Sequence, residues 1–349
     1  MVKIGSVTLS SPFAIAPMAG MTDSAFRRLV KRRGGCGLVV TEMVSSEGLV
    51  RGIDRTLEYA EYTEEERPVS IQIFGGDPEK MAAAAQIVEG MGADVVDVNM
   101  GCPVPKIAKH NAGCSLMREP EHAARVIDAM TKAVKIPVTV KMRAGWNDAD
   151  RNAPELARMV EQAGAAAVAI HGRTAAQSYT GTADWDLVAQ VAAQLTIPVF
   201  GSGDCVEPEQ IVDRTQRGVE GVLVGRGVLR NPWILAQAAD LTAGRPARTV
   251  TMEDRGRFLL DYIELLMDER VDESRALTHD RWVVNKLRAL ATYYTKGLEN
   301  GSHLRTAINS APSLIELCEI VERFFGCAQH DHALRGPQPP GAVTAQAEP

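Results

Sequence analysis

The chain reads Ala-Asp-Val-Val-Asp-Val-Asn-Met-Gly-Cys-Pro from residue 93 to residue 103. The apolar run at residues 95–98 predicts a buried strand, and Gly101 with Pro103 predicts a tight turn directly after it. This turn places Cys102 at the carboxyl end of the strand. In a barrel of parallel strands the active site lies at that end. A thiol in this position is therefore the first candidate for chemistry.

Similar apolar runs recur up to residue 224, and a segment of helical composition follows each of them. Their apolar residues are continuous rather than alternating, which indicates strands buried on both faces, as in a parallel sheet. The runs are Phe13–Ala16, Leu38–Thr41, Val69–Ile73, Val95–Val98, Val138–Lys141, Ala167–Ile170, Pro198–Phe200 and Gly221–Val224. Amphipathic stretches between them predict helices at residues 78–91, 121–134 and 153–163.

Eight strand–helix units over about 240 residues match the size of a (β/α)8 TIM barrel. A doubly wound parallel sheet is the alternative. That fold usually has fewer strands and a glycine-rich fingerprint after the first one, and no such fingerprint follows residues 13–16. We therefore predict an α/β fold with a catalytic barrel at residues 1–241.

The pattern changes after residue 241. Residues 241–251 form a linker rich in Gly, Arg, Pro and Thr, and residues 252–325 have helical periodicity, with breaks at 297–301 and at Pro312. We predict a separate all-α helical bundle at residues 252–326. The tail at 327–349 is rich in Pro, Gly and Ala, and we expect it to be disordered.

The composition is that of an ordinary soluble globular protein, since 45% of the 349 residues are hydrophobic and 23% are charged. The net charge of −6 gives no overall signal for nucleic acid, so a polyanionic partner needs a local basic surface. The six cysteines include no C-x-x-C pair and no spacing typical of a zinc site or a disulfide framework. No apolar stretch approaches the ~20 residues of a membrane span, and the start of the chain has no signal-peptide pattern. We therefore expect a cytoplasmic protein with free thiols, no metal and no membrane association.

Polar side chains stand at the ends of successive predicted strands, where a packed core does not need them. Taken singly, each is more often structural than functional. Their recurrence at corresponding strand ends favours an active site, because barrel sites are assembled in this way. These residues are Gln72, Asn99, Cys102, Lys141, Arg143, His171 and Arg173.

Glycine-rich loops follow the last two predicted strands, with Gly-Ser-Gly-Asp at residues 201–204 and Gly-Arg-Gly at residues 225–227. Glycine lets backbone N–H groups approach an anion closely, and phosphate sites of barrels commonly lie on these two loops. Either loop alone fits a simple tight turn. Together with Arg226 they favour a phosphate group of a cofactor or substrate that lies across the barrel mouth, beside Lys141.

In their order along the chain, these motifs resemble those of the bacterial tRNA-dihydrouridine synthases, nearest the DusB-type (NifR3-like) branch. The resemblance covers roughly residues 4–325 and is most specific at residues 99–113. The motifs that carry it are Ala-Pro-Met-Ala-Gly-Met-Thr-Asp at 16–23, Gln72, Asp-x-Asn-x-Gly-Cys-Pro at 97–103, Lys-x-Arg at 141–143, His-Gly-Arg-Thr at 171–174 and Gly-Arg-Gly at 225–227. The resemblance implies an FMN-containing barrel followed by a helical tRNA-binding domain.

The resemblance also implies which residues would hold FMN. The backbone packed against the flavin ring would be that of Pro17, Met18 and Ala19. The groups at its polar edge would be Gln72 and Lys141, with His171 over the ring or near the phosphate. The phosphate would be held by Ser202, Gly203, Asp204, Gly225 and Arg226. Many relatives have Asn where this chain has Ser202, so the contact at that position must differ.

The reaction implied is the reduction of uridine in tRNA to 5,6-dihydrouridine, in which NADPH reduces FMN and the flavin passes a hydride to C6. Cys102 would give the proton to C5, because a thiol with an ordinary pKa of about 8.5 is mostly protonated at neutral pH and still acidic enough. Covalent addition is the alternative and requires the thiolate. A purely structural role of the turn also remains open. Asn99 and Arg143 would face the uracil, and Lys106 the RNA.

A local basic surface is present in the predicted helical domain. Residues 281–305 contain five basic residues and one acidic residue, although the whole chain is negatively charged. Arg281 and Arg288 are seven residues apart and therefore share one face of a helix. We predict that this face contacts tRNA phosphates, the alternative being an ordinary solvated surface.

Three functions are compatible with these features. The first is the flavoenzyme that reduces uridine in tRNA, a monomer with tRNA and NADPH as partners. The second is an FMN-barrel reductase of a free pyrimidine or an enone, against which the extra helical domain argues. The third is a non-catalytic RNA-binding regulatory protein, against which Gln72, Cys102 and Lys141 argue.

Overall fold

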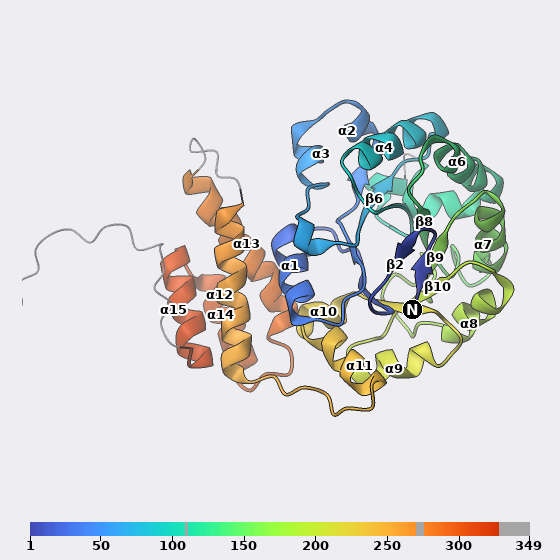
Figure 1. Cartoon of the computed structure of the whole chain (residues 1–349). Helices are drawn as coiled ribbons and strands as arrows, with labels where there is room; N and C mark the ends of the chain where they lie inside the picture. Colours follow the sequence, from blue (N-terminus) through green and yellow to red (C-terminus); the bar gives the residue numbers. More distant parts are fainter. Residues whose placement is uncertain (109–110, 270–275, 328–349) are drawn as a thin grey trace, which may run out of the picture. The chain divides into compact units, whose positions relative to one another are not determined.

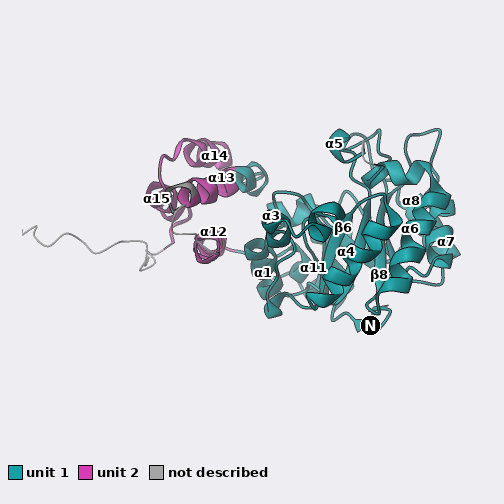
Figure 2. Cartoon of the chain, turned by 90° about the horizontal axis from the view of Figure 1, so that it is seen from above, with its two compact units in different colours: residues 1–250, 289–298 teal, residues 251–288, 299–349 magenta. Residues whose placement is uncertain are grey.

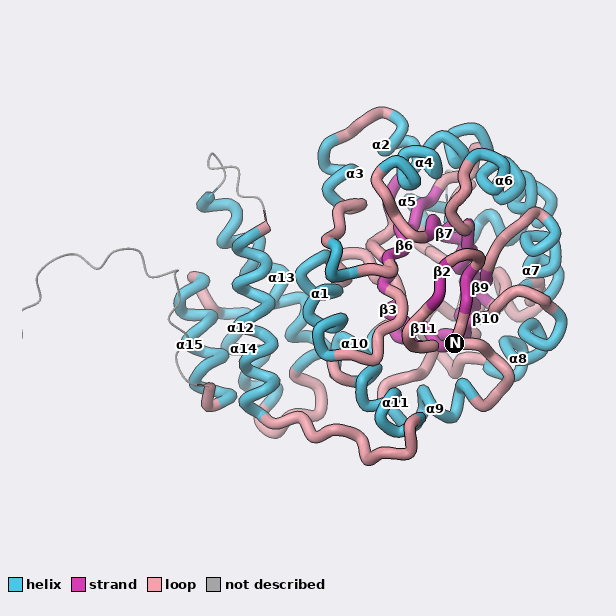
Figure 3. The backbone as a smooth tube through the Cα atoms, viewed as in Figure 1, coloured by secondary structure: helices cyan, strands magenta, loops and turns pink. Residues whose placement is uncertain are grey.

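The computed structural model describes residues 1–108, 111–269 and 276–327, with only the backbone at 276–278. Within these residues, parallel strands form a ring that helices surround (Figures 1 and 3). The strands are β3 Phe13–Ile15, β4 Val39–Val40, β6 Val69–Phe74, β7 Val95–Met100, β8 Val138–Arg143, β9 Ala167–His171, β10 Val199–Ser202 and β11 Gly221–Val224. The ring runs β3, β11, β10, β9, β8, β7, β6, β4, and a bridge between Ala14 and Leu38 joins its two ends. The predicted (β/α)8 TIM barrel is confirmed, and the doubly wound alternative is wrong.

The helices of the barrel begin where the sequence supplies capping residues. Asp77 caps α4 by accepting hydrogen bonds from the N–H groups of Glu79 and Lys80, and Asp184 caps α8 through the N–H of Leu187. The helices are α1 Ser24–Arg33, α2 Ser46–Val50, α3 Asp54–Glu58, α4 Pro78–Gly90, α5 Pro105–Ala108, α6 Pro120–Ala133, α7 Ala153–Gln162, α8 Trp185–Gln194, α9 Pro208–Thr215, α10 Arg226–Arg230 and α11 Ile234–Thr242. Shorter elements are β5 Val44–Ser45, η1 Glu64–Glu66 and η2 Gly113–Arg118. The three helices predicted by residue range correspond to α4, α6 and α7.

Neighbouring strands align polar residues on the inner side of the ring. Gln72 of β6 is opposite Asp97 of β7, and Asp97 is opposite Thr139 of β8. Further along the same strands, Asn99 is opposite Lys141. Side chains two residues apart on a strand point to the same face, so Asp97 and Asn99 both point into the barrel. The register therefore brings residues from three separate segments into adjacent positions.

A short hairpin closes the barrel at the amino ends of its strands. It consists of β1 Lys3–Ile4 and β2 Val7–Thr8, which pair antiparallel, and Gly5 in its turn has a φ of +56°. Ile4 and Leu9 are only 2% and 1% exposed. Both belong to the apolar cluster that fills this end of the barrel interior together with strand residues such as Phe200. This hairpin was not predicted from the sequence.

The part of the chain after the barrel is helical, as predicted. The helices are α12 Met252–Asp268, α13 Ala276–Tyr294, α14 Gly301–Ser310 and α15 Leu314–Phe325. The chain divides into two compact units, residues 1–250 with 289–298 and residues 251–288 with those from 299 on (Figure 2). The tail predicted to be disordered lies, beyond Cys327, outside the described residues. None of the described helices is long and apolar enough to span a membrane.

Candidate active site

Cys102 follows β7 on a turn that the side chain of Asn99 holds. Asn99 Oδ1 accepts hydrogen bonds from the backbone N–H groups of Gly101, at 3.1 Å, and of Cys102, at 2.9 Å. The carbonyl of Cys102 accepts a further hydrogen bond from the N–H of Cys114 at 3.1 Å. Contacts of this kind between a side chain and the nearby backbone fix a turn. The thiol is therefore presented at the carboxyl end of the barrel in a defined position.

Cys102 differs from the other cysteines in its exposure. All six are free, and Cys102 is half-buried whereas the other five are buried. Burial raises the pKa of Cys36 to about 11 and that of Cys205 to about 12, so these two stay protonated at neutral pH. Because a thiol reacts only where it is accessible, Cys102 is the cysteine available to a substrate.

Below Cys102, a row of buried polar side chains crosses three strands. Asn99 Nδ2 donates to Gln72 Oε1 at 2.7 Å, and Gln72 Nε2 donates to Asp97 Oδ2 at 2.7 Å. Asp97 Oδ1 accepts from Thr139 Oγ1 at 2.6 Å. Burial raises the pKa of Asp97, while the hydrogen bonds from Gln72 and Thr139 oppose that shift. Sequence analysis missed Asp97 and Thr139 as site residues, although a carboxylate within an apolar strand run was the available signal.

Lys141 places a cation next to this row. Burial, with a smaller contribution from Arg143, lowers the pKa of its ammonium to about 8, and the nearby Asp97 and Cys102 oppose the shift. Its ammonium donates to no other residue in the described part of the chain. A desolvated cation of this kind favours an anionic ligand, which restores the interactions lost from water.

Arg143 connects the loops that follow β7 and β9. Its side chain is 4% exposed. Its Nε donates to the carbonyl of Gly101 at 2.7 Å, and its Nη1 donates to the carbonyls of Thr174 at 3.1 Å and Ser178 at 3.0 Å. Arg143 was predicted to face the substrate. The structure gives it a positioning task as well, because three of its hydrogen bonds hold the walls of the site.

His171 is a neutral imidazole in this environment. Burial lowers its pKa to about 2, and the cations of Lys141, Arg143 and other arginines lower it further. Its Nδ1 accepts a hydrogen bond from the backbone N–H of Arg173 at 3.1 Å. A neutral ring that accepts at Nδ1 carries its proton at Nε2. His171 therefore offers one N–H donor and no charge to a ligand.

Asp204 is bound by Arg173 rather than left open to a ligand. Arg173 Nη2 lies 2.7 Å from Asp204 Oδ1, and the backbone N–H of Ala183 donates to Oδ2 at 2.7 Å. Arg173 is 3% exposed, and its Nη1 is buried with no hydrogen-bond partner among the described residues. Asp204 was predicted to hold a phosphate together with Ser202, Gly203, Gly225 and Arg226. In this geometry its carboxylate positions Arg173 and the loop after β10.

The loops after β10 and β11 require two of their glycines. Gly203 has a φ of +122°, and a Cβ there would lie 2.6 Å from the Cβ of Ala183. A Cβ on Gly227 would lie 2.2 Å from the carbonyl oxygen of Cys205, so the two loops touch through their backbones. Ser202 is buried, and its carbonyl accepts from the N–H of Gly172. Arg226 begins α10 directly after Gly225.

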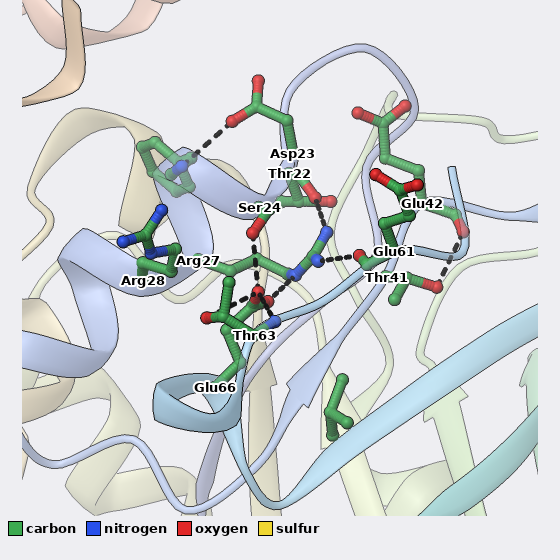
Figure 4. Close-up of polar contacts among 12 residues, drawn as sticks. Thr22, Asp23, Ser24, Arg27, Arg28, Thr41, Glu42, Glu61, Thr63 and Glu66 are labelled. Atoms are coloured by element: carbon green, nitrogen blue, oxygen red, sulfur yellow. Dashed lines mark hydrogen bonds and ion pairs between the residues drawn. The ribbon is translucent and has the colours of Figure 1, made fainter. Parts of the chain in front are cut away.

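The segment that carries Pro17, Met18 and Ala19 is tied to a buried ion pair (Figure 4). Arg27 Nε lies 2.6 Å from Glu66 Oε2, and these side chains are 2% and 0% exposed. Arg27 Nη1 donates to the carbonyl of Thr22 at 2.7 Å, and Ser24 Oγ donates to Glu66 Oε1 at 2.6 Å. The hydroxyl of Thr22 in turn accepts from the N–H of Met18 at 3.0 Å. Sequence analysis did not find this pair, whose partners are far apart in the chain.

Nearer the mouth, the same segment is fixed by a second acid. The buried Glu42 accepts from the N–H of Gly20 at 2.6 Å through Oε2. The carbonyl of Glu42 accepts from the hydroxyl of Thr41 (Figure 4). The same hydroxyl also accepts from the N–H of Gln72. The backbone at residues 17–19 is therefore held rigidly before any ligand arrives.

The residues predicted to contact RNA lie outside this cluster. Lys106 is exposed on α5, and Arg281 is exposed on α13. Arg288 is half-buried, and its Nη2 donates to the carbonyl of Ala311 at 3.0 Å, at the end of α14. Arg288 thus has a structural contact that Arg281 does not share. No three His, Cys, Asp or Glu side chains in the described ranges come together as a metal site requires.

Comparison with known proteins places these residues in a family context. A family model described as dihydrouridine synthase matches residues 14–328. A probable tRNA-dihydrouridine synthase from Rickettsia conorii is 35% identical over 96% of this chain and 99% of its own length. The tRNA-dihydrouridine synthase B of Pseudomonas aeruginosa is 35% identical over 95% of this chain and 97% of its own. A probable tRNA-dihydrouridine synthase from Rhodobacter capsulatus is 44% identical over 70% and 76%, respectively.

Among solved structures, a 2-naphthoyl-CoA reductase in complex with 2-naphthoyl-CoA superimposes with a TM-score of 0.54. The match covers 75% of this chain and 55% of that one, at 14% sequence identity. At this identity the likeness concerns the fold alone.

Proposed function

Because the chain belongs to the dihydrouridine synthase family, we propose that it reduces uridine in tRNA to 5,6-dihydrouridine in the cytoplasm, with FMN as bound cofactor and NADPH as reductant. One observation carries the proposal. Cys102 is the accessible thiol of the chain, and it sits on a fixed turn at the barrel mouth, three residues after Asn99, which lies opposite Lys141 on the neighbouring strand. A proton donor beside a desolvated cation is what the addition of a hydride and a proton across a uracil double bond requires.

The residues present fit FMN. Lys141 offers an ammonium that has no described hydrogen-bond partner, and His171 Nε2 offers a neutral donor. Gln72 has a second amide hydrogen besides the one that it donates to Asp97, although its side chain is fully buried in this structure. For the phosphate we propose the backbone of Ser202 and Gly203 together with Gly225 and Arg226, while Asp204 acts through Arg173. The backbone of Pro17, Met18 and Ala19 would contact the ring.

When bound, FMN supplies the hydride, taken from NADPH, that adds to C6 of the uracil. Cys102 donates its thiol proton to C5 from the opposite face, so that one hydride and one proton together saturate the bond between these carbons. The thiolate left behind takes a proton from solvent before the next turnover. Lys141 stabilises negative charge at the polar edge of the cofactor. Arg143 contributes through Nη2, which donates to none of the described residues, and Asn99 through the turn that it holds.

The tRNA has to present the base outside its stack, because a paired or stacked uracil cannot reach the bottom of a barrel mouth. We propose that Lys106 and Arg281 contact phosphates of the RNA, since both are exposed cations. Arg288 contributes to this surface less directly, because it also holds the end of α14.

The test begins with the purified protein. We expect it to bind FMN, and to oxidise NADPH when unmodified tRNA is added but not when free uridine is added. Oxidation with free uridine would favour the reductase of small pyrimidines, and a protein that takes up no FMN would exclude both enzymes. Mass spectrometry of tRNA from cells that lack the protein should then show which dihydrouridines disappear.

A further inference from the structure

A continuous chain of hydrogen bonds connects the barrel interior with Cys102. It runs from Thr139 through Asp97, Gln72 and Asn99 to the backbone N–H groups of Gly101 and Cys102. Its side chains are shielded from water, with exposed fractions of 0% for Gln72, 6% for Asp97, 8% for Asn99 and 8% for Thr139. The hydrogen-bond chain crosses from β8 to β7, to β6 and back to β7, so it forms only when these three strands pair in the folded barrel.

The groups at both ends of this hydrogen-bond chain allow only one donor-to-acceptor direction along it. Burial raises the pKa of Asp97, but the hydrogen bonds from Gln72 and Thr139 and the charge of Lys141 favour its ionised form. In that form the carboxylate can only accept, so it requires Gln72 to present its NH2 group. Gln72 then turns its carbonyl to Asn99, which must present its own NH2 group. Asn99 thereby keeps its carbonyl for the N–H groups of Gly101 and Cys102, which can only donate. The two ends are consistent with each other.

The opposite direction leaves buried groups without partners. A reversed Gln72 would turn its carbonyl toward the carboxylate of Asp97, and a reversed Asn99 would turn its NH2 group toward the N–H of Cys102. Each mismatch would cost a hydrogen bond where water cannot replace it. A neutral amide at position 97 would remove the constraint at this end, because it can donate as well as accept, and would leave the direction to the N–H groups of Gly101 and Cys102 alone.

We propose that Asp97 is a positioning residue whose carboxylate sets the direction of this hydrogen-bond chain and thereby fixes the turn that carries the Cys102 thiol. This inference rests on the proposed function in one respect only, namely that the Cys102 thiol delivers a proton to uridine. The hydrogen-bond chain and its effect on Cys102 are independent of it.

The test measures how fast iodoacetamide alkylates Cys102 in the full-length protein as purified, by intact-protein mass spectrometry. The limiting rate at high pH is compared, because there the thiol is ionised in every variant and a change of nearby charge has no effect on its ionisation. We expect Asp97→Asn to raise this limiting rate about fivefold or more, which is the effect of losing one net hydrogen bond from the turn. Thr139→Val is the matched control. It removes a donor from the same carboxylate but leaves the direction unchanged, so its rate should stay within about twofold of the wild type.

A second variant moves the carboxylate by one link. In the double variant Asp97→Asn with Gln72→Glu, the new Asn donates to the new Glu. The carboxylate of that Glu can only accept, so it again requires Asn99 to present its NH2 group. The limiting rate should return to within about twofold of the wild type. A limiting rate for Asp97→Asn that equals that of Thr139→Val would overturn the proposal, and so would a double variant that stays as fast as the single one.

The five buried cysteines report on folding in the same spectrum, since they are alkylated only when the protein opens. If Asp97→Asn labels them too, Gln72→Met takes its place, because it breaks the next link and leaves the charge of Asp97 intact. We expect the same rise in the limiting rate, and its absence would overturn the proposal. The measurement needs neither NADPH nor tRNA. A protein without uridine reductase activity therefore refutes the proposed function alone, whereas unchanged alkylation in an active enzyme refutes this inference alone.

Discussion

Cys102 and Lys141 are side chains of the barrel mouth whose reactive groups have no hydrogen-bond partner among the described residues. Their neighbours Gln72, Asn99 and Arg143 use most of their donors and acceptors on the chain itself. This division separates groups that can react or bind from groups that hold them in place. It also predicts which substitutions should affect chemistry and which should affect assembly of the site.

Replacement of Cys102 by Ala should separate the two half-reactions. Flavin reduction by NADPH should keep its rate, because no step of it uses the thiol. Reduction of uridine in tRNA should fall by about 10²- to 10⁴-fold, the usual contribution of a general acid. Stopped-flow absorbance measures the first and mass spectrometry of the tRNA the second. Cys318→Ala, at a buried thiol of α15, is the control and should leave both rates unchanged.

Replacement of Lys141 by Met should stabilise the flavin-free protein. The pKa of about 8 for Lys141 in the folded protein lies below the ordinary lysine value of 10.5, so at neutral pH the folded state carries a proton that burial disfavours. We expect Lys141→Met to be more stable by about 1–3 kcal/mol near neutral pH. Between pH 8 and 10.5, Lys141 is protonated in the unfolded chain but mostly deprotonated in the folded protein. The free energy of unfolding of the wild type therefore rises with pH, and its difference from that of Lys141→Met shrinks. Urea denaturation at several pH values measures this, and a difference that grows with pH would contradict it.

The sequence was sufficient to find residues at strand ends but not the partners of those residues. Cys102, Lys141 and His171 were predicted because each follows an apolar run. The positioning task of Arg143 could not be predicted, since its acceptors are the carbonyls of residues 101, 174 and 178. Asp97 was visible as a carboxylate in a buried strand, but only the register with β6 and β8 shows which groups it binds.

Among the elements, α1 illustrates how a helix can fix a loop that precedes it. Arg27, in the middle of α1, reaches back to the carbonyl of Thr22 and across to Glu66 beside β6. The position of residues 17–19 therefore depends on a helix and a 3-10 turn that are not part of the site. Sequence patterns predicted the strand before α1 and a segment of helical composition after it, but the buried pair joins segments 39 residues apart. No local pattern carries that information.

Replacement of Glu66 by Gln should destabilise the barrel strongly. It leaves the guanidinium of Arg27 buried without a countercharge, and loss of one partner of a buried pair costs about 3–5 kcal/mol. Urea denaturation measures the free energy of unfolding. Glu65→Gln is the neighbouring control, because Glu65 pairs with Arg28 and Arg32 at the surface, where such pairs contribute about 1 kcal/mol or less. Equal losses in the free energy of unfolding for the two substitutions would show that the buried pair stabilises the protein no more than the surface pairs do.

The chain divides into two compact units. The breaks predicted at residues 297–301 and at Pro312 coincide with the bounds of α14 and α15, whereas the end of α12 at Asp268 was not predicted. The grouping of residues 289–298 with the barrel could not be predicted, because helical periodicity is continuous along α13. The basic residues of this region remain a prediction for the tRNA surface.

Replacement of Arg281 by Glu should weaken tRNA binding by about threefold to tenfold and lower the steepness of its salt dependence, because one phosphate contact and its released counterion are lost. Fluorescence anisotropy at several salt concentrations measures both. Lys132→Glu, on α6 of the barrel, makes the same change of charge at another exposed site and should have no comparable effect. Equal affinity losses for both variants would indicate a general effect of charge rather than a contact.

The closure of the barrel has a consequence for the time at which this protein can fold during its synthesis. β3, near the start of the chain, pairs with β11, and Ile4 and Leu9 pack against residues as late as Leu223. The apolar side chains of the segment that is synthesised first are therefore covered only after β11 has been synthesised. Nascent chains halted before residue 221 should be cleaved rapidly by protease, and those long enough to expose all of β11 should resist it. Until then, the early strands depend on protection from aggregation.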